Sequence, residues 1–290
     1  MSVFFNSRYE LRAAWKFAVF LAMLFPIMIG VGLGIRLLTH SFVNPEDFLH
    51  EVSLIEVINF VSVVLATLFM ARVMENYSLR VVGVGFFRGW AGNLLAGFGI
   101  AAGLIALVML LSEVVGSASV EWTAPNSSPH RMALTLGMLI IAAAFEELLF
   151  RGYLLQTLMK GIGFWPAMIL MSCIFGLLHS NNQNASRLGV FNTIVAGMML
   201  SLAYLKTRSL WFPYGIHLAW NVGTGMIVGF PLSGFGVVSL WTTHISGHPE
   251  LLGGAYGPEG GLLGTLIFAA GAIAVWKLPI ERINYEDRLY

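Results

Sequence analysis

Charged residues are scarce in this chain of 290 residues: Lys and Arg number 16, Asp and Glu number 15, and together they make up 11% of the sequence. Soluble domains carry about 25% charged residues, whereas 57% of this chain is hydrophobic. A soluble core of this size could not bury so much apolar surface. The net charge of +1 and the absence of a basic tract exclude disorder and nucleic-acid binding. The composition therefore predicts an integral membrane protein.

Cysteine and aspartate are almost absent, and this excludes several kinds of site. Cys173 is the only cysteine, so the chain has no internal disulfide and no Cys-based zinc site. An aspartyl intramembrane protease needs two membrane aspartates, but the two present, Asp47 and Asp287, lie in expected loops. No H-E-x-x-H and no Gly-x-Ser-Gly sequence occurs, which excludes site-2-type metalloproteases and rhomboid-type enzymes.

Long apolar stretches dominate what is present. A transmembrane helix needs about 20 apolar residues, and eight stretches reach or approach that length: roughly 13–38, 54–74, 90–111, 132–158, 164–179, 188–205, 208–229 and 261–277. The fifth and the last are short. We predict an all-α fold, a polytopic membrane helix bundle of about eight transmembrane helices, which forms a single membrane domain over residues 1–290.

The distribution of Lys and Arg predicts the orientation. With eight spans both termini lie on one side, and placing them in the cytoplasm leaves only Arg36, Arg131 and Arg187 in outer segments. The other thirteen then fall on the cytoplasmic side, as the positive-inside rule requires: Arg8, Arg12, Lys16, Arg72, Arg80, Arg88, Arg151, Lys160, Lys206, Arg208, Lys277, Arg282 and Arg288. We predict that both termini are cytoplasmic.

Ionisable residues inside spans are costly, at about 2.5–3.5 kcal/mol for each carboxylate on insertion scales, and they indicate function by default. The first group is Glu146-Glu147 followed by Arg151. Glu147 and Arg151 are four residues apart and can pair on a helix, whereas Glu146 points about 100° away. Taken alone, the group could equally be a Glu–Arg pair that joins two helices.

Two further groups stand on other predicted spans. Phe175 precedes His179 by four residues at the end of the fifth span, and His217 precedes Asn221 by four residues within the seventh, so these two share a helix face. Each alone could cap a helix or join helices by hydrogen bonds. Together, three helices bring carboxylate, imidazole and amide groups to the interior, which suits acid–base hydrolysis with a stabilised oxyanion.

In order, spacing and span placement these groups resemble the motifs of the CPBP intramembrane protease family, which includes the type II CAAX prenyl endopeptidases and bacterial abortive-infection proteins. The family pattern EExxxR, FxxxH and HxxxN/D reads here as Glu146-Glu147…Arg151, Phe175…His179 and His217…Asn221. The resemblance covers about residues 132–229, the expected catalytic core. The lead-in at 209–217 and the segment 254–260 are also similar to family members.

The resemblance implies an intramembrane endopeptidase that hydrolyses peptide bonds with a glutamate-activated water. Glu146 would be the base, His179 would position the water, and His217 with Asn221 would form the oxyanion site. Glu147 and Arg151, supported by Phe175, would be mainly structural. No cofactor is favoured. The alternative is a divalent metal such as zinc, held by Glu146, His179 and His217.

The resemblance also implies the partners: the lipid bilayer, a peptide or membrane-protein substrate whose lipidation the sequence leaves open, and no nucleic acid. The expected location is a bacterial cell membrane. Two rival functions are a non-catalytic membrane scaffold or immunity protein and an ion-coupled transporter. A scaffold has no need of the complete motif set, and the chain lacks the internal repeat of many transporters.

Three lesser expectations concern placement. Glu56, near the outer end of the second span, is expected to snorkel to the interface. Residues 253–264 are expected to form a flexible cap. Glu146 is expected nearer the cytoplasmic face and His179 nearer the outer face. These two depths conflict for residues of one site unless the fifth span is shifted or tilted.

Overall fold

The computed structural model describes residues 3–6, 10–39, 48–115, 118–123, 129–246 and 248–280. Asp47, Asp287 and three cations used for the orientation, Arg8, Arg282 and Arg288, lie outside these residues. The N-terminal half consists of α1 (Ala13–Thr39), α2 (Phe48–Leu68) continued by the π-helical turn η1 (Phe69–Met74), α3 (Leu79–Val82), α4 (Trp90–Val114), β1 (Ala118–Trp122) and α5 (Pro129–Glu147).

The second half continues from α5 through the π-helical turn η2 (Leu148–Leu154), which has a kink at Gly152, into α6 (Leu155–Ile162). It then comprises α7 (Phe164–Leu178) with η3 (His179–Asn181), α8 (Arg187–Thr207), α9 (Trp211–Asn221) with η4 (Val222–Val228), β2 (Trp241–Ile245), α10 (Pro249–Leu252), η5 (Gly254–Tyr256), η6 (Pro258–Gly260) and α11 (Leu262–Lys277).

The predicted all-α membrane bundle is confirmed. Within the described residues six helices are long and apolar enough to cross a membrane: Ala13–Leu38, Leu49–Met74, Trp90–Val114, Pro129–Ile162, Phe164–Asn181 and Arg187–Thr207. The other two predicted spans are also helical, as the shorter apolar helix α11 and as α9 with η4. The described strands form a single antiparallel pair, β1 with β2, in which Ala118 faces Ile245 and Trp122 faces Trp241.

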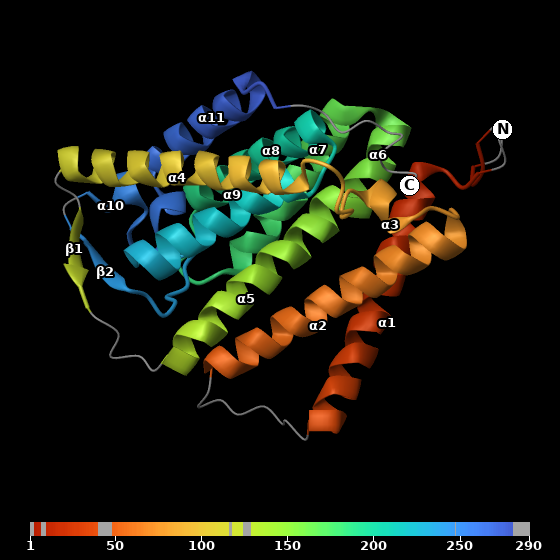
Figure 1. Ribbon diagram of the computed structural model, residues 1–290, viewed down its shortest axis with the longest axis horizontal. Helices are drawn as coiled ribbons and strands as arrows, with labels where there is room; N and C mark the ends of the chain where they lie inside the picture. Colours follow the sequence, from red (N-terminus) through yellow and green to blue (C-terminus); the bar gives the residue numbers. More distant parts are fainter. Residues whose placement is uncertain are drawn as a thin grey trace.

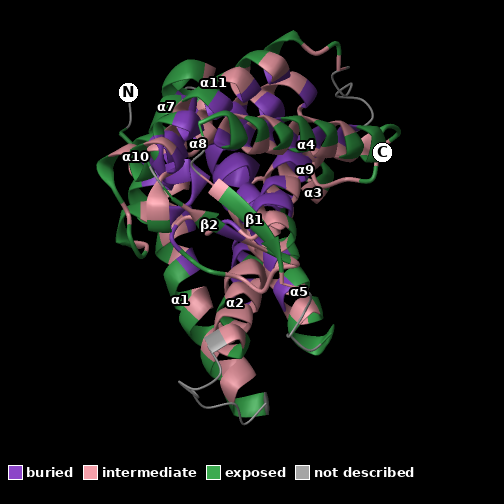
Figure 2. Cartoon of the chain, turned by 90° about the vertical axis from the view of Figure 1, so that its left-hand side faces the viewer, coloured by how far each residue is buried: buried purple, intermediate pink, exposed green. Residues whose placement is uncertain are grey.

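The bundle has two apolar cores. One joins α1, α2, η2, α6 and α7, and the other joins α4, α8, α9 and α11 (Figure 1). Figure 2 shows that buried residues gather in the centre of the molecule, whereas the lower parts of α1, α2 and α5 are exposed or half-buried, as expected for helix surfaces that face lipid. The polar motifs lie on α5 and η2, on α7 and η3, and on α9.

Close backbone contact fixes the position of α9. A Cβ atom on Gly97 of α4 would lie 2.5 Å from the carbonyl oxygen of Phe212, and one on Gly215 of α9 would lie 2.4 Å from the carbonyl oxygen of Leu94. Small residues let two membrane helices approach to this distance. Because Gly215 stands two residues before His217, the contact with α4 sets where the third motif lies.

The length of the fourth span removes the expected conflict of depth. The helical stretch Pro129–Ile162 has 34 residues with a kink at Gly152, and Glu146 stands in its middle. His179 begins the turn at the end of α7, and both side chains line one cavity. Arg151, which the orientation argument placed in a cytoplasmic segment, is instead buried at 1% exposure.

The segment expected to be a flexible cap is packed into the protein. Tyr256, Pro258, Glu259 and their glycine neighbours at 257 and 260 are buried. Gly257 has a φ of +90°, and a Cβ atom there would lie 2.0 Å from the carbonyl oxygen of Pro231. The expectation was wrong because glycine in this segment serves close packing and left-handed backbone rather than mobility.

Candidate active site

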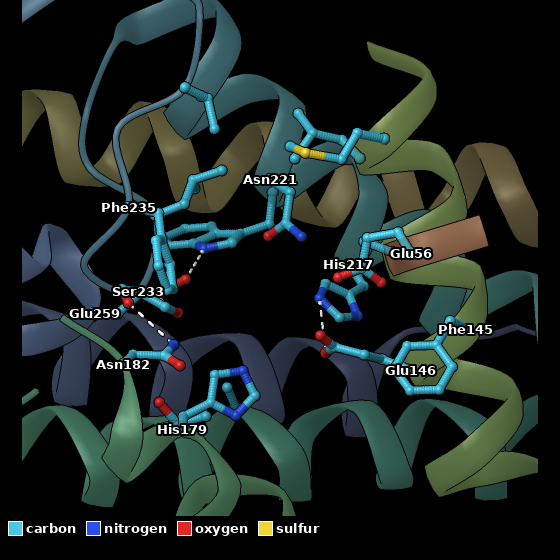
Figure 3. Close-up of a pocket in the computed structure, with 18 of the residues that line it drawn as sticks. Glu56, Phe145, Glu146, His179, Asn182, His217, Asn221, Ser233, Phe235 and Glu259 are labelled. Atoms are coloured by element: carbon cyan, nitrogen blue, oxygen red, sulfur yellow. Dashed lines mark hydrogen bonds and ion pairs between the residues drawn. The ribbon is translucent and has the colours of Figure 1, made fainter. Parts of the chain in front are cut away.

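One cavity of about 690 Å³ contains the polar groups of all three motifs. It is lined by Glu146 from α5, His179 from the end of α7, and His217 and Asn221 from α9 (Figure 3). Its wall also includes α2, α8 and the loop after η4. The structure therefore brings together all four residues that the sequence nominated as catalytic.

Glu146 is the accessible carboxylate of the pair. Its side chain is 24% exposed, compared with 1% for Glu147, and its Oε2 atom lies 3.7 Å from Nε2 of His217. No residue in the described part of the chain hydrogen-bonds to that Oε2 atom. A carboxylate whose side chain is partly exposed in a cavity can accept a proton from a water molecule that enters it.

Glu147 is fully buried and holds two other motif residues. Its Oε1 atom accepts a hydrogen bond of 3.1 Å from Nη1 of Arg151 and one of 2.8 Å from Nδ1 of His217. Arg151 also donates from Nη2 to the carbonyl oxygen of Gly197 on α8, at 3.0 Å. Glu147 therefore does more than the structural pairing expected from the sequence, because it also orients the imidazole of His217.

Phe175 supports this buried charge. The guanidinium carbon of Arg151 lies 4.7 Å from the centroid of the Phe175 ring, within cation–π range. The same ring contacts Phe150 edge to face, with 4.9 Å between centroids, and lies 4.6 Å from the ring of His179. Phe175 thus links the Glu147–Arg151 pair to the second histidine.

The two histidines are each fixed at Nδ1. In His179 this atom lies 2.8 Å from the carbonyl oxygen of Phe175. A carbonyl oxygen only accepts, so Nδ1 of His179 carries the proton and Nε2 is left for the cavity. In His217, Nδ1 donates to Glu147, so Nε2 is the atom that faces Glu146.

Two acidic residues of the cavity were not nominated from the sequence. Glu56 of α2 lines the cavity, although it was expected to snorkel to the interface. Glu259 of η6 accepts a hydrogen bond of 2.7 Å from Nε1 of Trp220 and another from the hydroxyl of Ser233. A carboxylate within an apolar run was a usable signal for Glu56, whereas nothing local to Glu259 indicated that its loop enters the bundle.

The donor geometry does not support the alternative metal site. Within the described residues no group of three or more His, Cys, Asp or Glu side chains is arranged to hold a metal ion. Glu146, His179 and His217 line the same cavity but do not form such a group. No step of the reaction is therefore assigned to a metal.

Comparison with known proteins gives two matches. Residues 128–223, which contain all three motifs, match the family model described as "Type II CAAX prenyl endopeptidase Rce1-like". The chain is also 24% identical over 183 residues to the "Putative membrane peptidase YdiL" of Bacillus subtilis (strain 168), over 61% of this chain and 72% of that protein. These matches confirm the resemblance that the motifs indicated, to the CPBP family of CAAX-protease-like membrane peptidases.

Proposed function

We propose that this protein is an intramembrane endopeptidase that hydrolyses peptide bonds with a water molecule activated by Glu146. One observation carries the proposal: Glu146, His179, His217 and Asn221, which come from three separate helices, face one cavity inside an apolar bundle. Polar groups at such depth are costly, and a scaffold would not need four of them around one space. The similarity to a CAAX-protease-like family supports the same chemistry.

In the proposed reaction Glu146 takes a proton from water as the water oxygen attacks the carbonyl carbon of the substrate. His179 positions that water through Nε2, because its Nδ1 atom is held by the carbonyl oxygen of Phe175. His217 and Asn221 donate hydrogen bonds to the oxyanion that develops on the substrate.

The role of Glu147 follows from the proton on His217. Because Nδ1 of His217 donates to Glu147, Nε2 can donate to an oxyanion only when the ring is an imidazolium. The carboxylate of Glu147 stabilises that cation, and Arg151 donates a hydrogen bond to the same carboxylate. Glu147 is thus proposed as the residue that holds His217 in its donating form.

The cavity suits a peptide substrate. Its volume of about 690 Å³ lies in the range of roughly 300–1,000 Å³ that is typical of ligand pockets. Apolar side chains such as Leu139, Met199 and Phe268 line much of it, which favours an apolar peptide segment over a strongly charged one. The peptide assay below, with and without prenylated members, also tests whether that segment carries a lipid.

We also propose that the termini are cytoplasmic and that substrate reaches the cavity from the opposite side. The cavity extends to Leu49 and Arg131, which stand in the first turns of α2 and α5. These turns follow the loops assigned to the outer side by the distribution of Lys and Arg.

The test is proteolysis of a peptide library, with and without prenylated members, by the purified full-length protein. Glu146→Gln is expected to lower kcat/KM by about 10²–10⁴-fold, the usual contribution of a general base, whereas the matched variant Glu113→Gln, at the exposed end of α4, should match the wild type. A chelator should leave activity unchanged. A wild-type protein that cleaves nothing, or a fully active Glu146→Gln variant, would favour the non-catalytic scaffold.

A further inference from the structure

Glu56 brings a second accessible carboxyl group to the cavity from a helix that carries none of the three motifs. It stands within α2, whose residues Phe48–Leu68 are otherwise largely apolar, and it lines the same cavity as Glu146, His217 and Asn221. Figure 3 labels it together with the other polar side chains that line the cavity.

The carboxyl of Glu56 has an unsatisfied oxygen. Its Oε2 atom is buried without a hydrogen-bond partner among the described residues, and the side chain also hydrogen-bonds to Asn59 on its own helix. Glu259, the third carboxylate of the cavity, has both oxygens occupied, by Trp220 and Ser233. Among the described residues, Glu56 and Glu146 are therefore the two cavity-lining carboxyls with an oxygen that lacks a hydrogen-bond partner.

The described surroundings of Glu56 offer no cation to pair with its carboxyl group. In the described part of the chain no Lys, Arg or His forms an ion pair with it, in contrast to Glu51, which pairs with Arg36, and Glu147, which pairs with Arg151. Burial without a cationic partner disfavours a carboxylate. Glu146 lines the same cavity, and two carboxyls that face one site tend to share a proton.

We propose that Glu56 is the general acid of the reaction, which gives its proton to the nitrogen of the leaving amine. This rests on the proposed peptidase function and assigns the second proton that the function requires. Glu146 takes one proton from water, the water oxygen bonds to the carbonyl carbon, and the carbon–nitrogen bond breaks. The leaving nitrogen takes the proton of Glu56, so that an acid and an amine are released. Glu146 then holds a proton that water in the cavity returns to Glu56.

A comparison of two leaving groups tests this assignment. The library peptide that the wild type cleaves fastest is prepared as the amide and as the 4-nitrophenyl ester of the same acyl segment. An amine must be protonated to leave, whereas 4-nitrophenolate leaves without a proton. Glu56→Gln should therefore lose about 10²-fold or more in kcat on the amide and much less on the ester. Glu146→Gln should lose activity on both, and Glu113→Gln on neither.

Each other result is decisive. If Glu56→Gln hydrolyses the amide at the wild-type rate, or loses the same factor on amide and ester, Glu56 is not the general acid, because a structural or binding role does not depend on the leaving group. If Glu56→Gln does not fold, Glu56→Asp carries the same comparison: its shorter acid should impair the amide more than the ester, and equal losses overturn the assignment. If the wild type cleaves no peptide of the library, the peptidase function itself fails.

Discussion

Replacement of Arg151 by methionine should destabilise the protein strongly, because it leaves a buried carboxylate without its cation. Arg151 and Glu147 are each only 1% exposed. Methionine keeps the apolar volume of the side chain but removes the bonds to Glu147 and to the carbonyl oxygen of Gly197. It also removes the cation over the Phe175 ring. Both removed hydrogen bonds anchor η2 and α8 near the centre of the bundle.

The magnitude follows from the contacts. Breaking a buried pair by removing one partner costs about 3–5 kcal/mol, and a desolvated cation–π contact contributes up to about 2 kcal/mol. His217 still donates to Glu147 at 2.8 Å, and as an imidazolium it compensates part of the negative charge that Arg151 no longer pairs. We therefore expect a loss of about 3 kcal/mol in the free energy of unfolding, the lower end of the range for a broken pair.

Reversible unfolding in mixed micelles measures this loss, and a double-mutant cycle with Glu147→Gln identifies its origin. The double variant should be less destabilised than the sum of the single variants, because neither charge is left alone. Arg88→Met, at an exposed arginine, should change stability by less than about 0.5 kcal/mol. A loss below about 1 kcal/mol for Arg151→Met, or additive effects in the cycle, would refute the claim that Glu147 depends on Arg151.

Two other substitutions test the packing around the site. Gly215→Ala would place a methyl group 2.4 Å from the carbonyl oxygen of Leu94. The unfolding free energy should therefore fall by about 1–3 kcal/mol, as in overpacked cores, and kcat should fall as α9 shifts. Wild-type stability in the same unfolding assay would show that α4 and α9 are not in close contact. Glu259→Ala leaves the Trp220 indole N–H and the Ser233 hydroxyl without their acceptor. The free energy of unfolding should fall by about 1.5–3 kcal/mol for each lost hydrogen bond to a charged group. An unchanged melting temperature would contradict the observed contacts.

Hydropathy alone predicted the helices well, because a backbone in lipid must satisfy its hydrogen bonds internally and the required apolar length is fixed by the bilayer. All eight apolar stretches are helical in the structure. What hydropathy could not show is the kink at Gly152 within the fourth stretch. The residues around it pack in the core formed with α1 and α7, and such tertiary contacts are not visible in an apolar pattern.

The motifs predicted which residues meet, but not how they bond. Spacing of four placed Glu147 beside Arg151, and the structure confirms that contact at 3.1 Å. The bond between Glu147 and His217 joins residues 70 positions apart, and no periodicity encodes such a pair. Glu56 and Glu259 were missed for the same reason, since their place in the cavity depends on how α2 and the loop before α11 pack.

The charges around His217 explain why these separate contacts belong to one arrangement. Glu146 and Glu147 carry two negative charges, and Arg151 supplies one positive charge. With both carboxylates ionised, the group is neutral when His217 is an imidazolium, and this is the form in which its Nε2 atom can donate to an oxyanion while Nδ1 donates to Glu147. A neutral group costs least inside a membrane. The physical requirement for burying the EExxxR motif and the proposed requirement for stabilising the reaction are therefore met by the same proton.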